Sequence, residues 1–174
     1  MLFNRIVGVF RLSAPVFEEI EHDRTATGQA ALVVAGVALL LGLGSGFTTV
    51  TGVGSFLQTF ITTFVWAFIG WVLWSGISYF VGTSLFGGRA DMGEMLRVIG
   101  FASAPLALGI IPCIGGLIGA LWAVAAGFVA VRQGLDLDNL RAMLTVIIGF
   151  VIYLLGYLLL LVAGLFFGRM FVLP

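Results

Sequence analysis

Few side chains in this sequence of 174 residues could do acid–base or metal chemistry. His22 is the one histidine, and it lies between Glu21 and Asp23. It could act as a general base or as a metal ligand. Either role needs several convergent partners, and a solvated run of charges does not provide them. We therefore interpret His22 as an interfacial surface histidine.

The other candidates also have structural explanations. Asp136, Asp138 and Asn139 carry oxygens that could bind a cation, but the remainder of a calcium-binding loop is missing. We interpret them as caps at the start of the last helix. Cys113 is the one cysteine, which excludes an internal disulfide and a cysteine metal cluster. The sequence thus predicts no catalytic residue, no cofactor and no metal site.

The composition decides which elements carry these side chains. Apolar residues make up 61% of the chain, with 25 glycines besides, whereas soluble domains are roughly 45–50% apolar even with glycine included. The mean hydropathy is +1.20. The formal net charge is zero, which gives nucleic-acid binding no electrostatic support. The sequence therefore predicts an all-α polytopic membrane protein.

Charge-free runs between the polar stretches predict five transmembrane helices. Residues 25–88 contain no charge and are too long for one span, so we expect a turn within the glycine-rich stretch 42–54. Prolines and glycines divide the charge-free run 98–131 into two spans, with a re-entrant hairpin as the competing interpretation. The predicted spans are 27–46, 56–83, 97–112, 115–131 and 142–168.

Alternating loops place seven of the eight arginines on the side of the N-terminus: Arg5, Arg11, Arg24, Arg89, Arg97, Arg132 and Arg141. This bias predicts an inner-membrane protein with a cytoplasmic N-terminus and an external C-terminal tail, 169–174. The charged elbow of Arg89, Asp91, Glu94 and Arg97 is then a cytoplasmic loop. None of the predicted span interiors carries a charge, which argues against proton or ion transport.

The N-terminal segment 1–26 is predicted to be cytoplasmic and amphipathic. Phe3, Ile6, Val7 and Phe10 recur at helical spacing on one face. Such a stripe favours a helix that lies in the headgroup plane as a membrane-surface anchor. A docking site for a soluble partner is the alternative.

Small residues every four positions predict close helix packing in the fourth span: Gly115, Gly119, Ala123 and Gly127. Gly164 and Gly168 form a second pair in the last span. Tyr153 and Tyr157 lie on one face of that last span and are expected to cover the first stripe. Oligomerisation or docking to another membrane protein is the alternative role for these residues.

Several segments, in order, resemble the bacterial branch of the Yip1 domain family over about residues 15–170. They are the approach from Pro15 to Glu19, the glycine turn Gly87-Gly88, the step Gly100-Phe101-Ala102 with Pro105, and Arg141-Ala142 before the last helix. The resemblance implies five membrane helices and a cytoplasmic N-terminus. Eukaryotic members of the family act in vesicle traffic with small prenylated GTPases, whereas bacterial members have no established activity.

These observations predict a non-enzymatic integral membrane protein with an interaction, scaffold or membrane-organising role. Its expected partners are the lipid bilayer and either a membrane protein or a second copy of itself. An accessory structural subunit of a larger membrane complex is the main alternative. A channel or transporter for a neutral solute is a weaker one.

Overall fold

A computed structural model of the protein describes residues 1–48, 53–111 and 114–172. This part of the chain contains helices and no strands, which confirms the predicted all-α class. The seven α-helices and one 3-10 helix, in order, are α1 (Leu2–Phe10), α2 (Ala14–His22), α3 (Ala26–Thr48), α4 (Val53–Phe86), α5 (Met92–Ala102), η1 (Ala104–Ile110), α6 (Gly115–Gly134) and α7 (Asn139–Val172).

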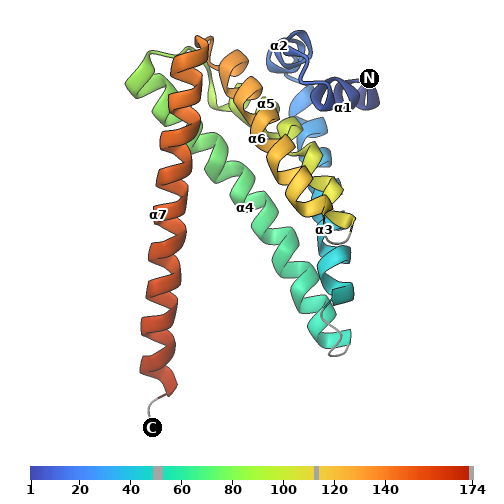
Figure 1. Cartoon of the computed structure of the whole chain (residues 1–174), viewed down its shortest axis with the longest axis vertical. Coiled ribbons are helices and arrows are strands. Elements are labelled where there is room, and N and C mark those ends of the chain that lie inside the picture. Colours follow the sequence, from blue (N-terminus) through green and yellow to red (C-terminus); the bar gives the residue numbers. More distant parts are fainter. Residues whose placement is uncertain (49–52, 112–113, 173–174) are drawn as a thin grey trace.

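Helices α3, α5, η1 and α6 form the packed part of the molecule, and α4 slants across it towards the far end of α3 (Figure 1). The two short helices α1 and α2 lie at one end of the molecule. Helix α7 contacts α4 and α6 near that same end and then runs away from the others (Figure 1). The start of α1 and the end of α7 consequently lie at opposite ends of the molecule (Figure 1).

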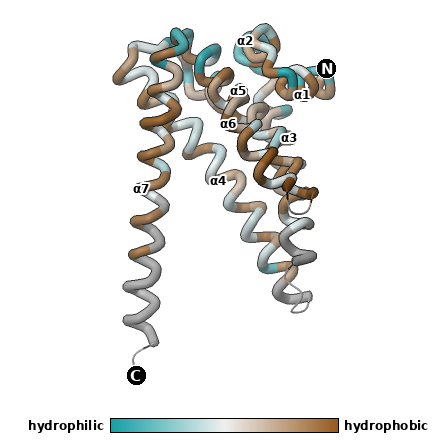
Figure 2. Tube along the Cα trace, in the orientation of Figure 1, coloured by the Kyte–Doolittle hydropathy of each residue, from teal (hydrophilic) through white to brown (hydrophobic). Residues whose placement is uncertain are grey.

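Five helical segments are long and apolar enough to cross a membrane: Ala26–Gly44, Phe56–Phe86, Met92–Ile110, Gly115–Gly134 and Asn139–Gly156. Hydrophilic residues gather mainly at the end of the molecule that carries α1 and α2 (Figure 2). The loop before α5 and the loop after α6 meet there. The Arg89 N–H in the first donates to the Leu135 carbonyl oxygen in the second at 3.0 Å. The protein is therefore a multi-pass membrane protein with one polar end.

The break between the first two long helices is shorter than the glycine-rich stretch 42–54 suggested. Helix α3 continues to Thr48 and α4 begins at Val53. Glycines are tolerated in membrane helices where they let neighbouring helices approach closely. Gly42 does this, because a Cβ atom added to it would lie 2.9 Å from the Phe60 ring.

Helix α5 begins at Met92, five residues before the predicted third span, so this helix carries Glu94 and Arg97. The expectation that every candidate span is free of charge is therefore wrong for this segment. The early start has a local cause. The Asp91 side chain accepts the Glu94 N–H at 2.7 Å, and the Glu94 side chain accepts the Asp91 N–H at 2.6 Å. This capping box stabilises a helix that begins with charged residues.

The third long segment changes from α-helical to 3-10 geometry near Pro105. Proline has no N–H and cannot continue the α-helical hydrogen bonding. The Ser103 hydroxyl donates to the Gly100 carbonyl oxygen at 2.6 Å, and η1 follows from Ala104 to Ile110. The last two helices also exceed their predicted spans, since α6 continues to Gly134 and α7 runs from Asn139 to Val172.

The core of the molecule lies towards its polar end. Phe17 on α2, Phe101 on α5 and Leu135 after α6 are fully buried there. The Trp71 ring on α4 packs against this cluster, and its Nε1–H donates to the Leu96 carbonyl oxygen at 2.9 Å. The two short N-terminal helices are thus part of the folded bundle.

Candidate functional site at the polar end

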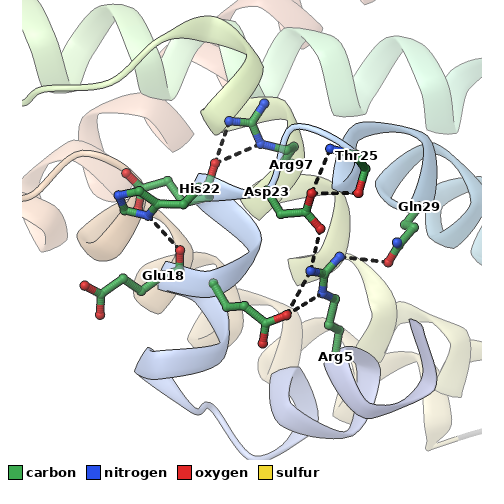
Figure 3. Close-up of polar contacts among 9 residues, drawn as sticks. Arg5, Glu18, His22, Asp23, Thr25, Gln29 and Arg97 are labelled. Atoms are coloured by element: carbon green, nitrogen blue, oxygen red, sulfur yellow. Dashed lines mark hydrogen bonds and ion pairs between the residues drawn. The ribbon is translucent and has the colours of Figure 1, made fainter. Parts of the chain in front are cut away.

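The polar end contains a buried arginine that joins three helices. Arg5 on α1 is only 4% exposed. Its Nη2 lies 2.8 Å from Oε1 of Glu19 on α2 and 2.6 Å from Oδ2 of Asp23 (Figure 3). Its Nη1 donates to Oε1 of Gln29 on α3 at 3.0 Å. Arg5 therefore fastens α1 to α2 and to the start of α3.

Hydrogen bonds hold the carboxylate of Asp23 in its charged form. The Thr25 hydroxyl and Arg5, followed by the Thr25 N–H, lower the pKa of Asp23 from 3.8 to about 2. Burial alone would lower the pKa of Arg5, but its bonds to Asp23 and Glu19 raise it. A lowered carboxyl pKa stabilises the folded state above pH 3.8, and this contribution is lost as the pH falls towards 2. The Arg5 contacts are therefore complete throughout the neutral range.

A second buried arginine joins α5 to the end of α2. Arg97 is 5% exposed, and its Nε and Nη2 both donate to the carbonyl oxygen of Glu21, at 2.9 and 2.5 Å (Figure 3). This oxygen lies at the carboxyl end of a helix, where the helix dipole favours a positive charge. Arg97 was predicted in a loop, but the structure places it inside the bundle as a contact between α2 and α5.

Glu21, near the end of α2, has a buried carboxyl group with a raised pKa. Glu21 is only 6% exposed, and burial raises its pKa from 4.5 to about 7. Neighbouring His22 is exposed, and its Nδ1 lies 2.9 Å from the Glu18 carbonyl oxygen. That hydrogen bond, followed by the charge of Glu21, raises the pKa of His22.

The apolar stripe of α1 is divided between the bundle and the outside. Phe3 is 74% exposed. Ile6, Val7 and Phe10 are half-buried, and the side chains of Ile6 and Phe10 pack against the core. The Trp122 Nε1–H on α6 donates to the Phe10 carbonyl oxygen at 3.0 Å. Helix α1 therefore lies against the bundle, while Phe3 remains free to contact lipid.

The loop before α7 contains the capping residue predicted there. The Asp138 Oδ1 accepts the Arg141 N–H at 3.0 Å, which confirms the capping role of Asp138. Arg132 donates to the side chains of Gln133 and Asn139. An open pocket of about 420 Å³ lies over this loop and is lined by both signs of charge. Among the described residues, no three His, Cys, Asp or Glu side chains converge in a way that could hold a metal ion.

The first half of the small-residue stripe packs on η1. Gly115 and Gly119 are buried, and Ala123 and Gly127 are half-buried. A Cβ atom added to Gly119 would lie 2.7 Å from the Pro105 carbonyl oxygen, whereas one added to Gly127 would meet nothing within 4 Å. The close approach is thus made to the 3-10 helix that follows α5.

The tyrosine expected to cover this stripe contacts a different helix. Tyr153 lies edge-on to Trp74 of α4, with ring centroids 6.0 Å apart. The surroundings of Tyr157, Gly164 and Gly168 on α7 lie outside the described residues, and so does Cys113, which precedes α6.

The fold and its polar end can be compared with known proteins. A family model described as the Yip1 domain matches residues 7–170. The chain belongs to the Yip1 domain family. No curated protein and no solved structure matches it. The Yip1 family is not known as enzymatic. The matched residues include the last turn of α1 and all of α2. Arg97 therefore lies within the matched domain, whereas Arg5 precedes it.

Sequence reasoning did not single out Arg5, Gln29 or the buried Glu21 as functional candidates. The i, i+3, i+4, i+7 stripe of α1 shows which face is apolar, but it does not show which polar side chain turns inward. One signal was present: Arg5 lies only one residue before the apolar pair Ile6-Val7. That position can bring an arginine close to the buried edge of a short helix.

Proposed function

We propose that this protein is a non-enzymatic interaction protein of a bacterial inner membrane, which presents α7 to a partner membrane helix. The proposal is supported mainly by the exposure of α7. Residues 150–156 are all exposed, and seven consecutive helical residues cover every face of the helix. Beyond the contact between Tyr153 and Trp74, this helix diverges from α4 (Figure 1).

Lipid can cover an isolated apolar helix, so crosslinking within the membrane tests the proposal directly. A photo-crosslinking residue at Leu155 on α7, which is 61% exposed, should capture another polypeptide in the native membrane. The matched control is Leu121 on α6, which has the same residue type and is 64% exposed. We expect a protein adduct from position 155 and lipid adducts from position 121.

The adduct identifies the kind of partner. A second copy of the chain would indicate self-association, whereas stoichiometric recovery in a large complex would indicate an accessory subunit. Lipid adducts alone at both positions would contradict the proposal. Protein-dependent flux of a neutral solute into liposomes would favour a channel instead.

The proposed orientation has its own test. Seven of the eight arginines lie in the N-terminal segment, in the loop before α5, or in the adjoining turns of α5, α6 and α7. Positively charged segments are retained in the cytoplasm. A reporter fused after Pro174 should therefore behave as external, and one fused before Met1 as cytoplasmic. Cytoplasmic activity at both ends would mean an even number of crossings and would overturn the five-span topology.

A further inference from the structure

Glu21 is a buried acid for which the described residues provide no hydrogen-bond donor or ion-pair partner at the carboxylate. It lies at the end of α2, where this helix packs against α5 and α6. Arg97 is close by, but its guanidinium is bound to the Glu21 backbone carbonyl oxygen (Figure 3). A carboxylate that is largely removed from water and lacks such a partner favours its protonated form.

Three of the neighbouring charges also disfavour ionised Glu21. Glu18 on α2, Glu94 on α5 and Asp136 in the loop after α6 are carboxylates whose negative charge disfavours a further one at Glu21. Exposed His22 has the largest effect among the neighbouring charges and opposes these three, but burial of the Glu21 carboxyl outweighs it. Ionised Glu21 would therefore gain stability from further exposure of its carboxylate to water, which separation of the end of α2 from α5 would allow.

We propose that Glu21 is a proton-binding site that makes the packing of α2 against α5 and α6 tighter as the pH falls through neutrality. Below pH 4.5 the carboxyl is neutral whether α2 is packed or separated, so the packed state keeps its full stability. As the pH rises towards 7, the separated state gains stability by releasing the proton, and above pH 7 the loss is complete. His22, whose pKa is also raised, adds an effect of the same sign.

The size of the change in the packing equilibrium follows from the pKa of Glu21 in the packed and in the separated state. A carboxyl with a pKa of about 7 when packed and 4.5 when separated changes the packing equilibrium by about tenfold between pH 8 and pH 6. The Arg5 contacts are constant over this range, because the pKa of Asp23 is far below it. Helix α1 therefore stays attached while the end of α2 responds to pH.

Hydrogen exchange of the full chain in nanodiscs tests this proposal. We compare the wild type with Glu21→Gln at the same pH, which cancels the chemical pH dependence of exchange. The protection of the α2 amides in the wild type, relative to Glu21→Gln, should fall about tenfold between pH 6 and pH 8. Glu18→Gln removes the weakest of the three carboxylate effects on Glu21, so it should keep the pH dependence with a midpoint at slightly lower pH.

A ratio between wild type and Glu21→Gln that does not change with pH would overturn the proposal. A second measurement remains decisive if Glu21→Gln fails to fold. In the wild type, carbon-13 NMR of labelled glutamate should show one carboxyl that titrates near pH 7. Titration of every glutamate at its ordinary pKa would also overturn the proposal.

Discussion

Replacing Gly119 with alanine is expected to destabilise the folded bundle by about 1–3 kcal/mol, because the added methyl group overpacks the contact between α6 and η1. Its Cβ atom would lie 2.7 Å from the Pro105 carbonyl oxygen and 3.4 Å from the Leu106 Cα atom. These are backbone atoms and cannot rotate away. Thermal unfolding of the purified protein in detergent measures the loss.

Gly127→Ala is the matched control on the same helix. It has the same intrinsic gain of helix propensity, about 1 kcal/mol, and its added methyl group meets nothing within 4 Å. The control should be neutral or stabilising. Equal behaviour of the two variants would show that α6 does not depend on the close approach to η1.

Replacing Arg5 with methionine is expected to release α1 at a cost of about 2–3 kcal/mol. The substitution keeps much of the apolar stem but removes all four hydrogen bonds to Glu19, Asp23 and Gln29. The cost is lower than for a fully buried pair, because the Glu19 side chain is 59% exposed and remains hydrated.

Trypsin cleavage after Arg11 reports the release of α1. If opening is fast relative to cleavage, a cost of 2 kcal/mol raises the cleavage rate by about 30-fold. Arg24→Met is the control, because Arg24 is exposed and has no side-chain hydrogen bond among the described residues. Unchanged cleavage in the Arg5→Met protein would mean that lipid contacts, and not Arg5, hold α1 in place.

The sequence predicts the long helices well because hydropathy and charge act locally. Charge-free runs are long enough to require spans, and the arginines indicate which ends lie together. The same local reasoning places the end of the elbow in a loop at Arg97, whose partner, the Glu21 carbonyl oxygen, is 76 residues away. No spacing within the elbow reveals that contact.

The turn predicted across the glycine-rich stretch 42–54 is too long for a similar reason. Glycine predicts a turn when only the local backbone is considered. Gly42 instead remains helical and makes room for the Phe60 ring, which is a property of the pair of helices. The predicted partner of the α6 stripe was wrong for the same reason, since η1 and not Tyr153 lies against it.

The N-terminal helices α1 and α2 bond to residues that come much later in the chain, which has a consequence for biosynthesis. Phe10 bonds to Trp122, 112 residues later, and Glu21 bonds to Arg97. At 5–20 residues per second, the ribosome needs roughly 4–22 s to add these partners after it has added α1 and α2. During that time, the two helices have no bundle to dock on. Their apolar residues must then be shielded by the membrane surface or by a chaperone, so the amphipathic pattern is needed before the protein is complete.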